Sequence, residues 1–333
     1  MARVFVGLSG GVDSAVAAHL LIEEGHDVTG VFIRGWEPDF LACSGAADRL
    51  SAMQVAAHLG IPFRTYDLSE EYKASVVDAF VAEYRAGRTP NPDVLCNRFI
   101  KFGSAWERAR ADGAEYFATG HYADTNGAVL RAARDATKNQ TYFLWTLTRA
   151  DLEHTRFPLG KMLKTEVRAL ARRVRLPNAA RKDSQGLCFL GDVDMHRFLK
   201  RYLPSEPGPI LYNGATIGTH DGSWFYTLGQ HVAASSKERL YVVDKRGNEL
   251  IVSETPAPLT QATTCTLLSE SYVSGQPPQG IVRAEYRYHG PQVRATVDQS
   301  IVTFEKPVLV AKGQSVVFYD QQGVVCYGGG IVA

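Results

Sequence analysis

The stretch Ser9-Gly10-Gly11-Val12-Asp13-Ser14 lies between an apolar run over residues 2–8 and a helical pattern over Ala15–Glu24. The apolar run is typical of a buried strand, and Gly25 stands where a helix commonly ends. Glycines directly after a strand let the backbone approach a phosphate group, and the following helix offers its unpaired N–H groups to an anion. The stretch therefore predicts a strand–loop–helix unit that binds phosphate.

Strand and helix patterns continue to alternate after this unit. Strand-like runs cover Asp27–Ile33, Phe63–Leu68 and Tyr116–Thr119, and helical patterns end near Leu59 and cover Ser69–Arg85. Alternating strands and helices are typical of a parallel sheet with helices on both faces. We therefore expect an α/β fold with a doubly wound parallel sheet in the first half.

The pattern of alternating strands and helices ends at Pro204–Pro209, which has the composition of a linker. Short β-rich runs separated by turns follow it, which is typical of small sheets and barrels. The sequence predicts a catalytic domain over 1–203, a small β-rich central domain over 204–258 and a C-terminal β-barrel over 259–333. The predicted strands include Ser223–Leu228, Leu240–Val243, Ile281–Tyr288, Gln292–Val297 and Ser315–Tyr319.

The bulk composition sets further limits. The 333 residues are 45% hydrophobic and carry a net charge of +1. No apolar run approaches the roughly 18 residues that cross a bilayer, and the N-terminus lacks a signal-peptide pattern, so we expect a cytoplasmic protein. Five widely spaced cysteines without a C-x-x-C pair argue against a disulfide scaffold and a zinc ribbon. Three of them are expected to be structural: Cys43, Cys265 and Cys326.

One segment is strongly basic although the whole chain is nearly neutral. Residues 149–182 contain ten Lys and Arg residues against three Asp and Glu residues. Part of this segment, Glu166–Val174, has the apolar spacing of an amphipathic helix, which Pro177 is expected to end. The arginines Arg168, Arg172 and Arg173 predict a site for a polyanion, although a solvated helix face would have the same composition.

The glycine-rich loop excludes two common nucleotide sites. It lacks the lysine of a Walker A loop and does not match the G-x-G-x-x-G dinucleotide pattern. Instead, Ser-Gly-Gly-Val-Asp-Ser resembles the PP-loop of ATP pyrophosphatases, which binds the β and γ phosphates as leaving pyrophosphate. The loop alone leaves several enzymes open, including synthetases for GMP, NAD and argininosuccinate, and a plain helix-capping turn remains the alternative.

Two cysteines lie in segments rich in turn and polar residues. Cys96 lies within Gly87–Asn97, and Cys188 lies within Lys182–Phe189. Because a free thiol is mostly protonated at neutral pH, sulfur chemistry needs electropositive surroundings. A helix N-terminus after Cys96 and the cations Arg181 and Lys182 near Cys188 would supply them.

With these segments, the chain resembles the tRNA-specific 2-thiouridylase family over essentially its whole length. The matching stretches occur in the family's order: the PP-loop, Gly87–Asn97, Ala118–Tyr122, Lys182–Phe189, Tyr226–Gln230 and Gly313–Ser315. The resemblance implies that Cys188 carries a persulfide sulfur, that Cys96 is its redox partner and that Asp93 acts as acid or base beside the target base.

The resemblance also implies the binding residues and partners. ATP with Mg²⁺ would contact Gly7, Leu8, Ser9, Gly10, Gly11, Val12, Asp13, Ser14, Ile33 and Gly120. The tRNA would contact Asn91, Pro92, Asp93, His121, Lys138, Asn139, Gln140, Arg287, Tyr288 and Gln314. No resident metal ligands are implied. A persulfide-donating protein is the implied partner, and the chain is expected to be a monomer.

Three departures from the family pattern weaken individual assignments. Asn139 replaces an Asp, so a carboxylate is lost there. The segment His231–Ser235 replaces a glycine-rich stretch, and His289–Pro291 follows Arg287 and Tyr288.

The reaction that the resemblance implies begins when the C2 oxygen of a uridine, expected to be the wobble uridine, attacks the α-phosphate of ATP. The sulfur on Cys188 then replaces the adenylated oxygen. Three alternatives remain at this point. They are another PP-loop enzyme acting on a small molecule or a different tRNA base, a non-catalytic tRNA-binding protein, and an iron–sulfur sulfurtransferase with Cys96, Cys188 and Asp93 as cluster ligands.

Overall fold

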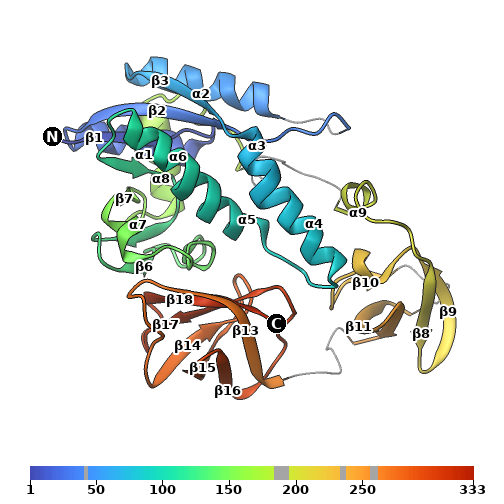
Figure 1. Cartoon of the computed structure of the whole chain (residues 1–333). Helices are drawn as coiled ribbons and strands as arrows, with labels where there is room; N and C mark the ends of the chain where they lie inside the picture. Colours follow the sequence, from blue (N-terminus) through green and yellow to red (C-terminus); the bar gives the residue numbers. More distant parts are fainter. Residues whose placement is uncertain (41–43, 184–194, 233–237, 256–261) are drawn as a thin grey trace.

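The computed structural model describes residues 1–40, 44–183, 195–232, 238–255 and 262–333. Its first sheet is wholly parallel, and the strands lie in the order β3-β2-β1-β4-β7 (Figure 1). The strands are β1 (Arg3–Gly7), β2 (Asp27–Arg34), β3 (Phe63–Asp67), β4 (Tyr116–Ala118) and β7 (Thr155–Arg156). The expected strands at residues 2–8, 27–33, 63–68 and 116–119 are thus confirmed.

Helices pack on both faces of this sheet because successive strand residues point to opposite sides. Val4 and Val6 join a buried cluster with three helices, whereas Phe5 joins the cluster on the other face. The first group is α1 (Val12–Glu23), α2 (Gly45–Leu59) and α8 (Lys164–Arg173). The second group is α4 (Asp78–Arg85), η2 (Cys96–Ser104) and α6 (Ala105–Ala111). The expected doubly wound α/β fold is confirmed.

Several of the expected helices are interrupted by π-helical turns. The predicted helix Ser69–Arg85 is present as α3 (Ser69–Tyr72), the π-helix η1 (Lys73–Val77) and α4 in succession. Likewise α5 (Pro92–Leu95) continues into the π-helix η2. The short helices are η3 (Thr141–Phe143), α7 (Arg149–Glu153), α9 (Met195–Leu199) and η4 (Ser223–Phe225).

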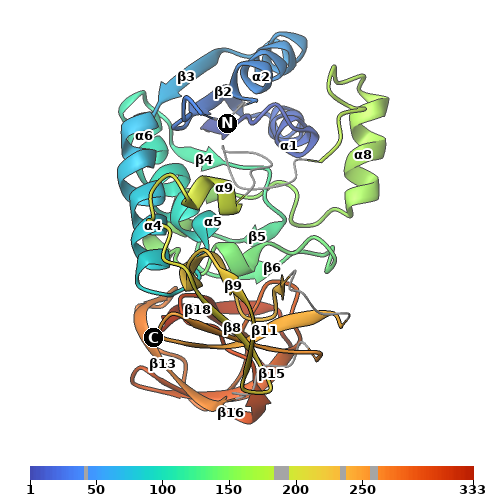
Figure 2. The same cartoon turned by 90° about the vertical axis from the view of Figure 1, so that its right-hand side faces the viewer.

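The second half is rich in β structure, as expected, and forms two separate sheets (Figure 2). The smaller sheet has the order β10-β11-β12-β8-β9, formed by β8 (Gly208–Tyr212), β9 (Ala215–His220), β10 (His231–Val232), β11 (Leu240–Arg246) and β12 (Glu249–Ser253). The other sheet closes into a barrel because its first strand pairs with its last. The barrel strands are β13 (Ala262–Tyr272), β14 (Ile281–Glu285), β15 (Gln292–Asp298), β16 (Ile301–Val308), β17 (Ser315–Tyr319) and β18 (Val325–Val332).

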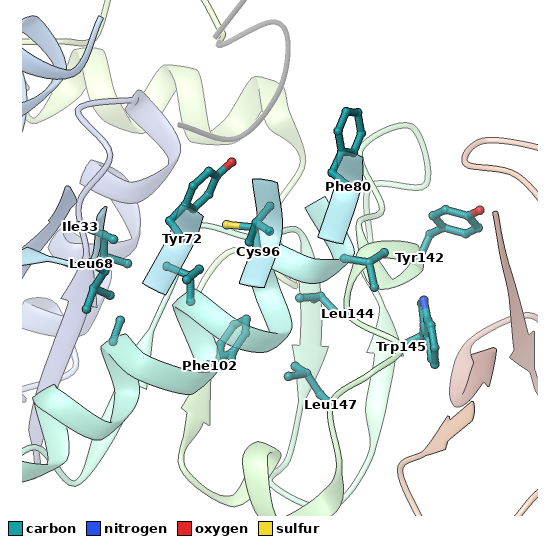
Figure 3. Packing of buried hydrophobic residues seen from close by; sticks show 14 of the residues in the cluster. Ile33, Leu68, Tyr72, Phe80, Cys96, Phe102, Tyr142, Leu144, Trp145 and Leu147 are labelled. Carbon is teal, nitrogen blue, oxygen red and sulfur yellow. The ribbon is translucent and has the colours of Figure 1, made fainter. Parts of the chain in front are cut away.

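A hairpin from the first half extends the barrel sheet. It consists of β5 (Ala123–Thr125) and β6 (Leu130–Ala132), and β6 pairs with β18. Nearby, the Trp145 indole donates to Ser315 Oγ at 3.0 Å, and the Tyr142 hydroxyl donates to the Ser315 carbonyl at 3.0 Å. Trp145 and Tyr142 lie at the edge of the first-half core that faces the barrel (Figure 3). The barrel and the α/β part therefore share a buried seam, which the sequence did not predict.

Three sequence predictions of local structure were wrong in detail. The run Ser223–Leu228 contains η4 rather than a strand, since the Ser223 hydroxyl donates to the Gly247 carbonyl and the aromatic side chains after it pack inward. The strand predicted for Ile281–Tyr288 ends at Glu285. The basic helix ends at Arg173, four residues before Pro177, because the chain turns through a positive φ of 54° at Arg175.

No helix among the described ranges is both long and apolar enough to cross a membrane.

Candidate functional site

A cavity of about 700 Å³ opens at the carboxyl ends of β1, β2 and β4, where parallel α/β sheets commonly bind ligands. Many of the predicted site residues line it: Gly7, Leu8, Ser9, Gly11, Val12, Asp13, Ser14, Ile33, Asp93, Gly120, His121, Lys138, Gln140 and Tyr288. Others do not line it: Gly10, Asn91, Pro92, Cys96, Asn139, Arg287 and Gln314. Cys188 lies outside the described residues.

The loop before α1 leaves the helix N-terminus open to an anion. Gly11 is the N-cap residue of α1 and provides no side-chain hydrogen bond to the first turn. The Ser14 hydroxyl instead stabilises the loop, since it accepts from the Ser9 N–H at 3.2 Å and donates to the Gly11 carbonyl at 3.1 Å. The first N–H groups of α1 therefore have no side-chain cap among the described residues, as expected of a phosphate-binding loop.

Three side chains hold the loop in place at Gly10. Its carbonyl accepts from the Ser51 hydroxyl at 2.9 Å, the Asn178 amide at 2.8 Å and the Arg181 guanidinium at 3.2 Å. Gly10 has a φ of 79°, and a Cβ there would lie 2.5 Å from the Asp48 carbonyl oxygen. Only glycine suits this position, which explains why Gly10 supports the loop without lining the cavity.

A second glycine, Gly120, lets the segment after β4 pack closely against the loop. A Cβ on Gly120 would lie 2.7 Å from the Ser14 nitrogen. The chain after β4 therefore packs directly against the start of α1, and a larger residue at 120 would push the two apart.

A network of charged side chains lies beside the loop. Lys164 Nζ is 2.7 and 2.8 Å from the two Asp13 carboxylate oxygens and 2.8 Å from Asp183 Oδ1. The Tyr122 hydroxyl donates to Asp13 at 3.1 Å, and Arg168 pairs with Asp183. Burial works against ionisation of Asp183, but its hydrogen bond and ion pair with Lys164 outweigh that effect and lower its pKa. Burial and the Asp13 charge raise the pKa of Tyr122, which keeps its proton.

Sequence reasoning missed Lys164, although one signal pointed to it. Lys164 is the first residue of α8, where the helix dipole disfavours a cation. A lysine in that place, on a helix otherwise well started by Glu166 at the third position, indicates that its charge is needed elsewhere. The structure gives the reason, since Lys164 pairs with two carboxylates in the cavity wall.

The predicted segment around Asp93 is a helix start. Asn91 caps α5, since its side-chain oxygen accepts from the Asp93 N–H at 3.1 Å, and Pro92 occupies the first helical position. Both residues are favoured in these places. They orient the first turn so that Asp93, rather than Asn91 or Pro92, lines the cavity.

Cys96 does not follow the sequence expectation of a helix N-terminus after it. It lies inside the continuous helical run of α5 and η2, with 0% of its surface exposed. Its neighbours in the core include Tyr72 and Phe80 (Figure 3). The redox role of Cys96 stays a prediction, as does that of Cys188.

The two cysteines expected to be structural fit that expectation where they are described. Burial raises the pKa of Cys326 to about 12 and that of Cys265 to about 11. Both therefore remain thiols at neutral pH and lack the reactivity of a thiolate. Cys43 lies outside the described residues.

His121 and Lys101 also line the cavity. His121 Nδ1 is 2.8 Å from the Thr119 hydroxyl, and its Nε2 is 3.4 Å from Lys101 Nζ. Burial, followed by the nearby Lys101 charge, lowers the pKa of His121 well below its usual value. The imidazole is therefore neutral and suited to hydrogen bonding rather than to pairing with phosphate.

The barrel contributes one wall of the cavity. Tyr288, in the segment after β14, lines it and packs against Phe143 with ring centroids 4.3 Å apart. Gln314 instead donates to the Thr89 carbonyl at 2.6 Å and ties the barrel to the segment before α5. Asn139 accepts from the Ala133 N–H at 3.2 Å and stabilises its own turn. Arg287 is exposed.

Comparison with known proteins identifies the family to which these site residues belong. Three family models match consecutive parts of the chain: a tRNA methyl transferase HUP domain over 2–192, a tRNA methyl transferase PRC-barrel domain over 196–254 and an aminomethyltransferase beta-barrel domain over 262–332. A tRNA-specific 2-thiouridylase MnmA from Thiobacillus denitrificans is 44% identical, and the match covers 99% of each chain. The chain belongs to the tRNA-specific 2-thiouridylase family.

Other relatives of the 2-thiouridylase family match equally broadly. The proteins of that name from Bordetella parapertussis and Streptococcus sanguinis are 42% and 40% identical, and each match covers 99% of this chain and 97% or 95% of the relative. Among solved structures, a 4-thiouridine synthetase–RNA complex with bound ATP matches 57% of this chain and 45% of that chain at 20% identity, with a TM-score of 0.37. That structural likeness is too distant to carry an argument.

In this member of the 2-thiouridylase family, the arginines of the basic helix α8 lie in two different environments. Arg172 and Arg173 are exposed near the end of α8, as a polyanion site requires. Arg168 instead pairs with Asp183, which lines the cavity, and donates to the Ala179 carbonyl at 3.3 Å. The environment of Arg168 therefore differs from that of Arg172 and Arg173, and the polyanion site stays a prediction.

Metal ligands do not gather among the described residues: no three His, Cys, Asp or Glu side chains there could hold an ion together. The iron–sulfur alternative also involves Cys188, which lies outside them.

Proposed function

We propose that this member of the 2-thiouridylase family binds ATP in the cavity, adenylates the C2 oxygen of a tRNA uridine and replaces that oxygen with sulfur. One observation carries the proposal: the phosphate-binding loop and Asp93 line the same cavity, together with Tyr288 from the barrel. A volume of about 700 Å³ lies within the range of small-molecule sites. A nucleotide and a reacting base can therefore meet there.

The charges around the loop suit a triphosphate with its magnesium ion. Lys164 Nζ lies between Asp13 and Asp183, which supports the proposal that these carboxylates bind a cation. Asp13 and Asp183 would hold Mg²⁺, which neutralises phosphate charge when bound. Lys164, released from the carboxylates, would then pair with a phosphate oxygen, and the open N-terminus of α1 would hold the leaving pyrophosphate.

In the first step, the C2 oxygen of the uridine attacks the α-phosphorus of ATP. The new O–P bond forms as the bond between the α-phosphorus and the bridging oxygen breaks, and pyrophosphate leaves. Asp93, which lines the same cavity, would act as the base that takes the N3 proton after the O–P bond has formed, so that the N3–H group is intact while the uridine binds. The oxygen that was a poor leaving group can now depart as AMP.

In the second step, the terminal sulfur of a persulfide on Cys188 attacks C2, and AMP leaves. The Cys96 thiolate then attacks the Cys188 sulfur, so that a Cys96–Cys188 disulfide forms and the thiolated base is released. A dithiol reductant restores both thiols, and a persulfide-donating protein reloads Cys188. The family resemblance supports this assignment of the two cysteines.

The substrate is a tRNA, with the wobble uridine as the proposed target. A base in a stacked anticodon must leave the stack before an enzyme can reach its C2 atom. Asp93 and the aromatic ring of Tyr288 both line the cavity, which supports such a flipped base. We further propose that the protein acts as a monomer in the cytoplasm.

Two variants test the ATP half of this proposal. Asp13→Asn and Lys164→Met should each reduce tRNA-dependent pyrophosphate release at least about 100-fold, since each removes a charge at the reacting phosphates. Asp27→Asn, which changes an exposed carboxylate at the start of β2, is the matched control and should be silent. Binding of tRNA should change little in all three variants. Pyrophosphate release near the wild-type rate in Asp13→Asn would rule out this use of the loop.

A further inference from the structure

Asn97 is a buried polar residue in the cavity wall that the reaction described above does not use. It follows Cys96 in the π-helix η2, and its exposed fraction is 1%. Asp93, Asn97 and Lys101 all line the cavity from the same helical run. π-Helical turns occur frequently at functional sites, and here one sets this row of polar groups along the cavity.

The orientation of the Asn97 amide is fixed by its backbone partner. Asn97 Nδ2 donates to the Phe143 carbonyl at 2.9 Å, and only the nitrogen side of the amide can make that bond. Its oxygen, Oδ1, is buried and has no hydrogen-bond partner among the described residues. A buried acceptor without a donor costs roughly 1–3 kcal/mol. The cavity wall therefore holds an acceptor that is available to a ligand's donor.

The immediate neighbours of Asn97 suit a flat, uncharged ring. Phe143, whose carbonyl holds the Asn97 amide, lines the cavity and packs against Tyr288. Burial raises the pKa of Tyr288, so its hydroxyl stays neutral. Flipped bases are commonly held between aromatic side chains and recognised through hydrogen bonds to their Watson–Crick edge.

Uracil has a single N–H donor on its Watson–Crick edge, at N3, between the C2 and C4 oxygens. Cytosine presents an acceptor at N3 instead. We propose that Asn97 is a specificity-determining residue whose Oδ1 accepts the N3–H of the target uridine, with Phe143 and Tyr288 packing on the base. This inference rests on the proposed function, because it assumes that a uridine enters the cavity. It adds that the chain distinguishes uridine from cytidine at N3.

Asn97→Leu tests the inference because it removes the acceptor with little change in volume. The measurement is kcat/KM for tRNA-dependent pyrophosphate release, with anticodon stem-loops that carry uridine or cytidine at the target position. The full-length wild type should favour uridine, and Asn97→Leu should reduce the ratio of the two kcat/KM values about 10–100-fold. A purely structural role would lower both values and leave their ratio unchanged, and that result would overturn the inference.

Thr146→Val is the matched control. The Thr146 hydroxyl is also buried without a partner among the described residues, but it does not line the cavity. Its removal should leave both the rate and the uridine-to-cytidine ratio unchanged, whereas a change in the ratio as large as that of Asn97→Leu would contradict the inference.

A second measurement needs no variant and so does not depend on the folding of Asn97→Leu. The wild-type protein, without ATP, is given stem-loops with uridine or 3-methyluridine at the target position, and its affinity should fall at least about tenfold when N3–H is absent. Equal affinities for the two would overturn the inference. Failure of the wild type to form any thiouridine from uridine would instead contradict the proposed function, so the two failures are distinguishable.

Discussion

Asp13 lies between two hydrogen-bond donors, the Lys164 ammonium and the Tyr122 hydroxyl. Lys164 in turn joins Asp13 to Asp183, which also pairs with Arg168, so two carboxylates and two cations compensate one another. Such a compensated network is stable without ligand and can exchange its partners when a triphosphate arrives. The loop itself was predictable from six consecutive residues. Lys164 was not, because it reaches the loop from a helix 151 positions along the chain.

The two cysteines should separate activation of the base from sulfur transfer. Cys188→Ser and Cys96→Ser should both retain tRNA-dependent ATP–pyrophosphate exchange, because neither thiol takes part in adenylation. Neither variant should form 2-thiouridine at the wild-type rate. Mass spectrometry of the intact Cys96→Ser protein should detect one added sulfur on Cys188.

Formation of product at the normal rate by Cys188→Ser would contradict the persulfide assignment. Cys265→Ser is the matched control. It changes a half-buried thiol of the barrel and should leave both exchange and thiolation unchanged.

At the scale of elements, most helices and strands followed from apolar spacing and turn residues, and the errors have local physical causes. The helix α8 was predicted from the spacing of Val167, Leu170 and Ala171, all of which are buried. Its end was not, because the positive φ at Arg175 precedes Pro177. The split of its arginines between surface and cavity depends on Asp183, which sequence spacing along one helix does not reveal.

The exposed end of α8 should bind tRNA through phosphate contacts. Each lost contact reduces the slope of log affinity against log salt by roughly 0.7–0.9, so changing Arg172 and Arg173 together to Ala should flatten the slope by up to about 2. Arg168→Ala should leave the slope nearly unchanged but reduce pyrophosphate release, because it pairs with Asp183. Filter binding over a salt series measures the slope, and Arg294→Ala on the barrel serves as the surface control. An unchanged slope in the double variant would make this end of α8 a solvated face.

At the scale of the molecule, the seam between the barrel and the α/β part is the feature that sequence reasoning did not reach. Trp145 and Tyr142 are fully buried there (Figure 3), and β6 pairs with the barrel strand β18. Hydrogen bonds between residues about 170 positions apart, such as Trp145 with Ser315, have no local signature. Removal of residues 205–333 would expose this core, so the contribution of the barrel is better tested by single substitutions in the seam.

Glu285 offers such a test through pH. It lies at the end of β14, is 7% exposed and accepts hydrogen bonds from Tyr319, the His289 N–H and Gln292. Burial raises its pKa from 4.5 to about 7. The folded chain therefore binds this proton more tightly than the unfolded chain, so the free energy of unfolding falls as pH rises from about 4.5 to about 7. The loss amounts to about 3 kcal/mol and is complete above that range.

Glu285→Gln keeps a neutral side chain at every pH and should remove this dependence. The Tm of the variant relative to the wild type should therefore rise between about pH 5 and about pH 8. Thermal unfolding at both pH values measures the difference, with Glu305→Gln on the exposed face of β16 as control. A Tm difference independent of pH would mean that Glu285 is ionised in the folded chain.

The most direct test of the account is the identity of the modified nucleoside. Unmodified tRNA is incubated with the full-length protein, ATP and a persulfide source, and its nucleosides are analysed by mass spectrometry. The account predicts 2-thiouridine, formed only when ATP is present and absent with Asp13→Asn. The appearance of 4-thiouridine or 2-thiocytidine, or of no thiolated nucleoside at all, would contradict it.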